Sequence, residues 1–474
     1  MLTALTLIVP ASAATFSRII GPFDLFPDSA DTVRQIREAV FDESGGNQFL
    51  VVLVAGLDST SYQALYRVNA ANEFQRIVAA GTATSRGPVI SHFGNYTLHG
   101  STAYFVAFDA AFTPYLCKVT EPDGPVTVIA AKGDLIAGLD VYDGFGGLSA
   151  HAGGLAFDAN VNRDNFFRSY HDVMHYDGAA ITSLVGYGTR PVPGGDSRFF
   201  FMNLDTGPIV RGGEVAFLGQ GQGAFLPAVR GIYALPLPGG AGTPRKLADN
   251  QDMAPGSAQP FNTIGLSQLQ LPLFAFDSGE AAFYATDFAN ADAGFYRHTT
   301  AGGLVTVADG DTVVPGGTQG FADGAFASGE ISLSGDRMIF RALDEFGNDG
   351  IYLQENGTFA KLIATGQEVA GTALNVFAVH RFGLAGDQLI FAGNFALYRA
   401  VLGDDPNPTP VSLVITRNGT DLSISWDGLG AGPGAVLRST TSLSNPDWQP
   451  VTGQSNPFNL TPEPTGARYY RLEQ

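Results

Sequence analysis

The sequence predicts an all-β protein: a seven-bladed β-propeller closed by an N-terminal strand, followed by a small C-terminal β-sandwich. Three observations lead to this prediction. An opening phrase recurs seven times, its closing phrase follows only six of these copies, and a seventh closing phrase stands alone near the N-terminus. The 60 Gly, 27 Pro and 11% aromatic residues suit many short strands joined by tight turns.

Each repeat opens with Gly, one or two polar residues and an apolar run, which ends in Phe in all copies but the first. The copies are GNQFLV (46–51), GSTAYF (100–105), GGLAF (153–157), GEVAF (213–217), GEAAF (279–283), GDRMIF (335–340) and GDQLIF (386–391). Their ends lie 51 to 66 residues apart. Variable spacing around a constant core is typical of loop insertions in stacked repeat units.

A second phrase with a central aromatic residue follows, such as GIYLQ (350–354), and then a closing phrase, such as FAKLIATGQEVAG (359–371). The missing seventh closing is FSRIIGPFDLFPD (16–28). Small sheets packed around an axis bury one another, but the ring separates unless its ends are joined. We therefore expect the N-terminal strand to pair with the sheet around Leu389 and Tyr398. An open array of β-sandwich repeats is the alternative, and it would not need this N-terminal phrase.

Within a repeat we expect four strands, a to d, for example EISLS (330–334), RMIFRAL (337–343), GIYLQ and FAKLIAT (359–365). Antiparallel strands place the b–c and d–a connections on one face of the ring, and the longest connections are d–a. Function is therefore expected on that face. The segment 29–43 is either a helix or an irregular connection followed by a strand. A column of residues is predicted to form the core between blades: Tyr66, Cys117, Tyr233, Tyr296, Tyr352 and Tyr398.

The phrases GGLAF, GEVAF and GEAAF, each followed by GIY-like and ADGDTVVPG-like phrases, resemble the bacterial tandem repeat with the motif Asn-x-x-Gly-x-x-Ala-Phe. The resemblance covers roughly residues 15–400. Ala150, Val210 and Phe276 stand at the place of the motif's Asn. Because that family is known from predicted secreted proteins, the resemblance implies export and a propeller-like architecture, and it implies no activity.

The ends of the chain suggest further segments. Residues 1–13 look like a signal peptide, because an apolar run ends in Ala11-Ser12-Ala13, although no basic residue precedes it. We therefore expect a secreted, periplasmic or cell-surface protein, with the propeller over residues 14–402. We expect a linker at residues 403–411 and a fibronectin-like sandwich over residues 412–474. Within the sandwich, Asn418-Gly419 is expected to form a hairpin turn and Trp426 to be a core residue. SLSNPDWQPV and the terminal YYRL resemble such modules of bacterial exported proteins.

The formal net charge of −19 argues against a nucleic-acid partner, because phosphate binding needs clustered Lys and Arg. Cys117 is the only cysteine, which excludes a disulfide framework. No apolar run reaches the ~18 residues of a membrane span.

The most specific metal-ligand pattern is DANVNRDN, in which Asp158, Asn160, Asn162 and Asp164 alternate. Alternating oxygen donors resemble the start of a Ca²⁺ loop, although the usual Gly and distal Glu are missing. Similar Asp/Asn-rich segments occur at 287–294 and 344–350. The alternative, which we favour, is that Asp and Asn only form hairpin turns. His171 and His175 lie too far apart on a strand for one Zn²⁺ and are expected to be exposed.

These observations favour an exported, non-enzymatic propeller that binds an unknown ligand, such as a glycan or a cell-surface protein, on the face of the long loops. Two alternatives stay open. One is a polysaccharide hydrolase or lyase with paired carboxylates in the channel, for example from YDGFGG (142–147) or TQGFADG (318–324). The other is a structural surface protein whose loops are stabilised by Ca²⁺. Whether the protein is an enzyme is left open.

Overall fold

The computed structural model describes residues 14–402 except 57–60, 138–139, 164–168, 194–197, 203–206, 223–228, 238–241, 266–272, 288–292, 302, 316, 323 and 327–329, and beyond them 413–418, 421–426, 436–440, 449–451, 458–460 and 469–473. The chain divides into two compact units, Ala14–Leu402 and a unit that contains Gly403–Gln474. The regular elements of the described residues are all strands. No described helix is long and apolar enough to cross a membrane.

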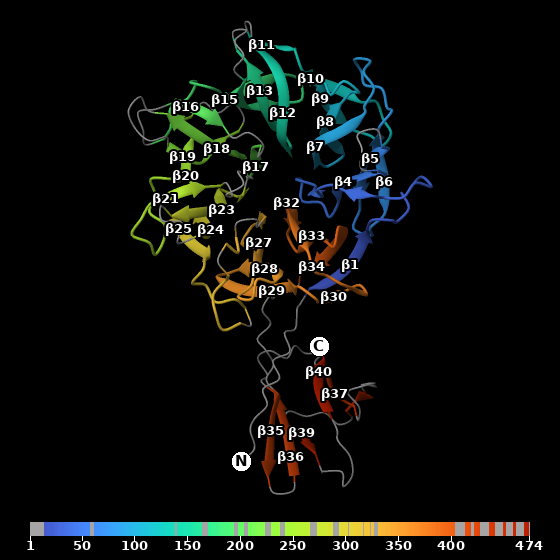
Figure 1. The fold of residues 1–474 in the computed structure, drawn as a ribbon, viewed down its shortest axis with the longest axis vertical. Coiled ribbons are helices and arrows are strands. Elements are labelled where there is room, and N and C mark those ends of the chain that lie inside the picture. Colours follow the sequence, from blue (N-terminus) through green and yellow to red (C-terminus); the bar gives the residue numbers. More distant parts are fainter. Residues whose placement is uncertain are drawn as a thin grey trace. The chain divides into compact units, whose positions relative to one another are not determined.

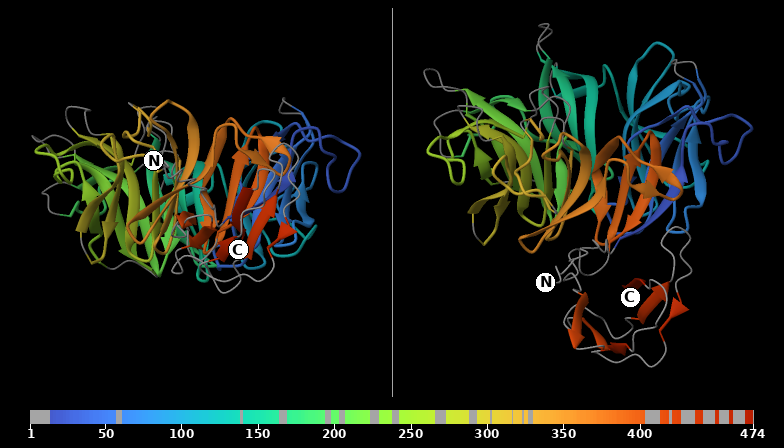
Figure 2. Two further views of the ribbon diagram at one scale, coloured as in Figure 1. Left: turned by 90° about the horizontal axis from the view of Figure 1, so that it is seen from below. Right: turned by 60° about the horizontal axis from the view of Figure 1, so that its bottom comes forward.

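The unit Ala14–Leu402 is a seven-bladed β-propeller, as predicted (Figures 1 and 2). Seven antiparallel sheets follow one another around an axis. The innermost strand of each sheet contacts the innermost strands of both neighbours, so the ring closes. In every blade the strands a to d run from the channel outward, and strand a is replaced by two short strands in blades 1, 4 and 5.

The first three blades follow one another counter-clockwise in Figure 1, from the right of the ring to its top. Blade 1 contains β2 (Gln35–Ile36), β3 (Val40–Phe41), β4 (Phe49–Val54), β5 (Gln63–Val68) and β6 (Phe74–Ala79). Blade 2 contains β7 (His92–His99), β8 (Thr102–Phe108), β9 (Pro114–Val119) and β10 (Thr127–Ala131). Blade 3 contains β11 (Leu135–Ala137), β12 (Asp140–His151), β13 (Gly154–Asn162), β14 (Ser169–Tyr176) and β15 (Ile181–Val185). The segment 29–43 is thus an irregular connection with two short strands.

The remaining blades repeat the same pattern. Blade 4 contains β16 (Arg198–Met202), β17 (Ile209–Arg211), β18 (Glu214–Gln222), β19 (Val229–Pro236) and β20 (Arg245–Asp249). Blade 5 contains β21 (Phe261–Ile264), β22 (Phe274–Asp277), β23 (Glu280–Asp287), β24 (Gly294–Thr299) and β25 (Gly303–Ala308). Blade 6 contains β26 (Ile331–Ser334), β27 (Arg337–Leu343), β28 (Asp349–Glu355) and β29 (Thr358–Ala364), followed by the hairpin β30 (Glu368–Val369) and β31 (Thr372–Ala373).

Blade 7 joins the two ends of the ring. Its inner strands are β32 (Phe377–Ala385), β33 (Gln388–Gly393) and β34 (Ala396–Val401), and its outer strand is β1 (Thr15–Ile20). Strand β1 pairs antiparallel with β34, with Arg18 opposite Tyr398, and Figure 1 shows the blue β1 beside the orange β34. This confirms the predicted closure. The buried Arg399 adds a second link, donating hydrogen bonds of 2.8 and 2.7 Å to the carbonyls of Asn69 and Ala70 in blade 1.

One register recurs in all seven blades. The last residue of each opening phrase lies opposite one residue of strand c, in the pairs Val51–Tyr66, Phe105–Cys117, Phe157–Met174, Phe217–Tyr233, Phe283–Tyr296, Phe340–Tyr352 and Phe391–Tyr398. All of these side chains are buried. The predicted core column is therefore confirmed, and Met174 occupies its position in blade 3.

The d–a connections also repeat one conformation. Each closing phrase folds back through a single β-bridge or a very short strand pair: Leu25–Thr32, Ala83–Val89, Leu135–Val141, Pro191–Arg198, Met253–Pro260, Val313–Gly320 and Glu368–Ala373. The first residue of each pair precedes an inward-facing residue, such as Phe26 after Leu25 and Val314 after Val313. Each connection is thereby anchored in the ring while its tip remains on the surface.

The second unit contains two three-stranded sheets. One consists of β35 (Leu413–Asn418), β36 (Asp421–Trp426) and β39 (Phe458–Leu460), and the other of β38 (Gln449–Pro450), β37 (Val436–Thr440) and β40 (Tyr469–Glu473). Asn418 pairs with Asp421, which confirms the hairpin expected there. The fibronectin-type assignment stays a prediction.

Candidate functional site

A cavity of about 1130 Å³ lies inside the ring. Its walls come from the inner strands β7, β12, β22 and β32, from residues 34–38 of blade 1 and from Glu330 beside β26. Its rim includes Pro22 and Phe23 on the d–a connection between blades 7 and 1, and Asn394 and Phe395 on the b–c turn of blade 7. The cavity therefore opens on the face that carries the long connections, beside the seam where the ring closes.

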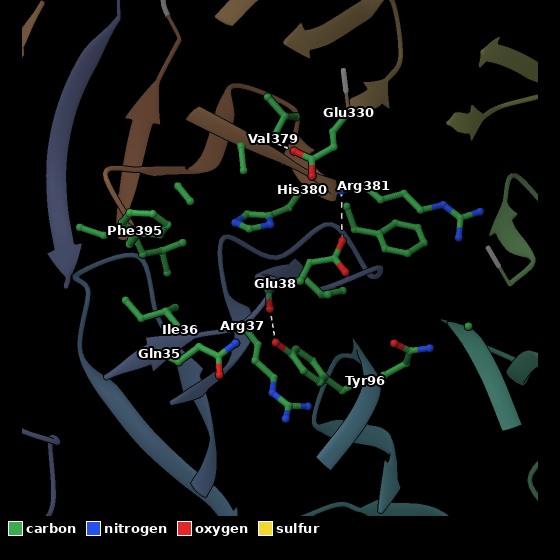
Figure 3. Close-up of a pocket in the computed structure, with 18 of the residues that line it drawn as sticks. Gln35, Ile36, Arg37, Glu38, Tyr96, Glu330, Val379, His380, Arg381 and Phe395 are labelled. Carbon is green, nitrogen blue, oxygen red and sulfur yellow. Dashed lines mark hydrogen bonds between the residues drawn. The ribbon is translucent and has the colours of Figure 1, made fainter. Parts of the chain in front are cut away.

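Two carboxylates extend into this cavity from different blades. Glu330 Oε2 accepts a 2.7 Å hydrogen bond from the backbone N–H of Val379, and Glu38 Oε1 accepts one of 3.2 Å from the N–H of Arg381. Both N–H groups lie on β32, which the two side chains approach from opposite sides (Figure 3). No other hydrogen bond to either carboxylate occurs within the part of the chain that the structure describes. Each therefore keeps an oxygen that a ligand could use.

The position of these carboxylates deep inside the ring changes their acidity. Burial raises the pKa of Glu330 to about 7, the hydrogen bond from Val379 opposes the rise, and the charge of Glu38 adds to it. Burial also raises the pKa of Glu38, while the positive charge of Arg381 and its backbone hydrogen bond oppose this shift. Although Glu38 is surrounded by the ring, its side chain is accessible from the cavity. Near neutral pH, Glu330 can therefore donate or accept a proton.

His380 and Arg381 supply polar groups without partners. His380 Nε2 and Arg381 Nε are both buried, and neither forms a hydrogen bond among the described residues. Burial lowers the pKa of His380 to about 4, so the imidazole is neutral at physiological pH. Arg381 donates a 2.9 Å hydrogen bond to the carbonyl of Gly207, and its guanidinium lies 4.7 Å from the ring centroid of Phe274.

A third carboxylate, Glu43, lies further along the inner strands and has a different environment. It accepts hydrogen bonds from Arg211, from Thr97, from Ser149 Oγ at 2.7 Å and from the N–H of Ala150 at 2.9 Å. These partners belong to blades 2, 3 and 4, and the Glu43 side chain is fully buried. Because its oxygens are already occupied, Glu43 connects inner strands and is not available to a ligand.

The carboxylates suggested from the sequence are not the ones in this cavity. Asp143 of YDGFGG forms a 2.7 Å ion pair with Lys132 and does not line the cavity, and Asp323 of TQGFADG lies outside the described residues. Glu38 and Glu330 were missed, although both stand at the start of an inner strand segment. The available signal was weak: Glu330 is the first residue of the predicted strand a at 330–334, and Glu38 lies in the segment 29–43, for which a helix and an irregular connection were both open.

The predicted calcium ligands lie on a strand. Asp158, Asn160 and Asn162 belong to β13, so the predicted loop conformation was wrong for these residues. Alternate strand residues are about 7 Å apart, which does not bring three of them to one ion. Asp158 Oδ2 lies 3.1 Å from His171 Nδ1, and the Oδ1 atoms of Asn160 and Asn162 are buried without a hydrogen-bond partner in the described chain. Asp164 lies outside the described residues, so calcium binding stays a prediction.

The expectation that His171 and His175 are exposed was also wrong, since both side chains are buried. Strand β14 packs against neighbours on both faces, so a histidine there needs a polar partner. His171 contacts Asp158, and His175 Nε2 lies 3.0 Å from His151 Nε2. The two histidines thus belong to separate pairs. Among the described residues no group of three or more His, Cys, Asp or Glu side chains could hold a metal ion.

Comparisons with known proteins identify a family. Residues 150–424 match the model of a family of unknown function, DUF7453. No curated protein matches the chain.

Several solved propeller structures are similar to the chain. An oligogalacturonate lyase in complex with manganese is 11% identical with a TM-score of 0.45, covering 85% of this chain and 100% of its own. The oligogalacturonate lyase of Vibrio parahaemolyticus is 11% identical with a TM-score of 0.43, covering 85% and 99%. The β-propeller domain of the Trilobed protease from Pyrococcus furiosus is 10% identical with a TM-score of 0.41, covering 83% and 95%. At such low identities the similarity concerns the fold alone.

Proposed function

The chain belongs to the DUF7453 family, whose function is unknown, and on that premise we propose that it is a binding propeller that holds a small ligand in its central cavity. One observation carries this proposal. The cavity brings together Glu38, Glu330, His380 and Arg381 from three blades, and each of them has polar atoms that the described protein leaves without partners. Of these atoms, His380 Nε2 and Arg381 Nε are buried, and the carboxylates are accessible from the cavity. Leaving buried polar groups unpaired costs stability, so the two buried nitrogens beside two accessible carboxylates support a ligand that pairs with them.

A thermal-shift screen of the full chain tests this proposal. The compounds should include sugars, amino acids, short peptides, nucleosides and organic acids, because the ligand is unidentified. Each compound that raises the melting temperature is then tested on Ala378→Trp, which places an indole in the cavity. Binding that is lost in Ala378→Trp supports the proposal. A screen without any stabilising compound, or with compounds that bind the variant equally well, contradicts it.

The second candidate function is cleavage of a glycosidic bond, and one observation favours it. A carboxyl with a pKa of about 7 next to a second carboxylate is the arrangement that acid/base cleavage uses. In this role Glu330 would be the proton donor and Glu38 the base or nucleophile. Release of reducing ends from polysaccharides, lost in both Glu330→Gln and Glu38→Gln, would support it. The control is Asp336→Asn, since that exposed side chain lies on an a–b turn. Activity that persists in both glutamine variants would exclude the pair.

We also propose that the protein is exported. The support is the apolar segment that ends in Ala11-Ser12-Ala13. Expression from the full gene in a bacterial host should yield a mature protein that begins at Ala14, which intact mass measurement detects. A cytoplasmic product that retains residues 1–13 would contradict export.

A further inference from the structure

Two phenylalanines at the rim of the cavity have an unusual backbone conformation. Phe23 has φ +72° and Phe395 has φ +66°, both in the left-handed region. This region is unfavourable for a bulky side chain, because Cβ approaches the backbone. Phe395 follows Asn394, also left-handed with φ +47°, and the pair forms a two-residue turn between Gly393 and Ala396. At the second position of such a turn Gly is the preferred residue.

Packing does not explain these residues. Phe23 is 70% exposed and Phe395 is 76% exposed, so neither ring contributes much apolar burial to the fold. Both line the cavity, and Figure 3 shows Phe395 on the cavity wall facing the region of Ile36 and Gln35. Arg34, another lining residue, lies with its guanidinium 4.8 Å from the ring centroid of Phe23. Such a conformation also occurs away from the cavity, at the exposed Phe112. Phe23 and Phe395 differ from Phe112 because both line the same opening, and this shared position points to a role in binding.

The polar groups inside the cavity restrict the charge of the ligand. Glu38 and Glu330 are accompanied by three arginines, Arg34, Arg37 and Arg381. Gln35 and Asn95 add neutral amides. A strongly anionic ligand would meet the two carboxylates, and a cationic one the three guanidinium groups. Instead, the mixture of donors and acceptors suits a neutral ligand whose groups both donate and accept hydrogen bonds, as hydroxyl groups do.

The aromatic rim and the polar interior of the cavity together fit one chemical class of ligand, a sugar. A pyranose ring has an apolar C–H face that packs on an aromatic ring and an edge of hydroxyl groups that pair with carboxylates, amides and guanidinium groups. The cavity volume of about 1130 Å³ exceeds the usual ~300–1,000 Å³ of small-ligand pockets, which leaves room for more than one ring.

We propose that the cavity binds a neutral oligosaccharide, with Phe23 and Phe395 stacking on a sugar ring at the rim and Glu38 and Glu330 accepting hydrogen bonds from hydroxyl groups of an inner ring. This inference rests on the proposed binding function. It assigns a role to the two strained turns, which hold the aromatic rings at the opening instead of folding them into the core.

The test is calorimetric titration of the full chain with four neutral hexasaccharides (maltohexaose, cellohexaose, xylohexaose and mannohexaose) and with hexagalacturonate as the acidic counterpart. At least one neutral hexasaccharide is expected to bind. Phe395→Gly and Phe23→Gly should each weaken that binding by about tenfold or more. Because Gly is favoured at these φ values, neither variant should lower the melting temperature, and Phe395→Gly creates the preferred Asn-Gly turn.

Phe112 provides the matched control. It is also left-handed, with φ +60°, and 59% exposed on the b–c turn of blade 2, but it does not line the cavity. Phe112→Gly should leave the affinity unchanged. Binding of hexagalacturonate alone, or equal affinities of wild type and both rim variants, overturns the inference. If no hexasaccharide binds while other compounds bind in a manner blocked by Ala378→Trp, the saccharide class is wrong and the binding function stands. If nothing binds, the binding function fails as well.

Discussion

The ring of Phe16 on the first strand lies edge-on against the ring of Phe391 in the last blade, with centroids 6.2 Å apart and an interplanar angle of 89°. This contact joins residues from the two ends of the propeller. Strand β1 contributes side chains to the core of blade 7 and backbone hydrogen bonds to β34, so the ring depends on it. Because the cavity lies at the same seam, the closure also shapes the candidate site.

Truncating a buried side chain of β1 should destabilise the whole propeller. Ile20 is 4% exposed and packs in the core that blades 7 and 1 share. Ile20→Ala is expected to lower the free energy of unfolding by about 2–5 kcal/mol, measured by urea denaturation. Thr15→Ala, at an exposed position of the same strand, should change it by about 0.5 kcal/mol or less. Equal effects of the two substitutions would mean that β1 does not close the ring.

Glu43 and Glu38 should respond differently to substitution, although both lie in the inner part of blade 1, after and before β3 respectively. Glu43→Ala leaves Arg211 without its carboxylate and removes the acceptor for Ser149 and Ala150, so we expect a loss of about 3–5 kcal/mol. Glu38→Gln keeps an acceptor for the N–H of Arg381 and should cost about 1 kcal/mol or less. Chemical denaturation of both variants measures the two losses in the free energy of unfolding. A large loss in Glu38→Gln would assign Glu38 a structural role and weaken the proposed site.

The raised pKa of Glu330 predicts a pH-dependent stability. The folded protein holds this proton up to about pH 7, whereas the unfolded chain releases it near the ordinary value of 4.5. The contribution of Glu330 to the free energy of unfolding therefore falls as the pH rises from about 4.5 to 7, and it is constant above that range. Denaturation of wild type and Glu330→Gln between pH 4.5 and 8 should show the variant gaining relative stability over this interval. A constant difference between the two would contradict the raised pKa.

The histidine pair in blade 3 predicts that stability depends on pH in the opposite direction. Burial, with the charge of His175 adding to it, lowers the pKa of His151 to about 4 from the ordinary 6.5, and burial lowers that of His175 as well. Between pH 6.5 and 4 the unfolded chain binds protons that the folded pair does not, so stability falls as the pH falls through this range. His175→Gln should make this decline shallower, as measured by thermal melts at several pH values. An unchanged slope would show that the pair is protonated in the folded state.

Much of the fold could be predicted from the sequence because the repeat phrases are local patterns. RMIFRAL coincides with β27 (Arg337–Leu343), and the seventh closing phrase is β1. The core column follows from the same periodicity, since Tyr66 and its equivalents stand at one place in every repeat. The burial of His171 and His175 could not be predicted, because polar side chains inside a blade depend on partners such as Asp158 and His151 that only the sheet pairing brings close.

The sequence by itself therefore determined the number of blades and the order of strands, because strand pairing and turn formation within a repeat depend on residues close to one another. It also indicated how the ring closes, because the closing phrase missing from the seventh repeat stands at the N-terminus, where β1 pairs with β34. Only the tertiary structure decided the candidate site. Glu38, Glu330 and Phe395 lie in blades 1, 6 and 7 and share no sequence pattern. Closing the ring brings them to one cavity and gives Glu330 its raised pKa, since burial and the charge of Glu38 act through space and not along the chain.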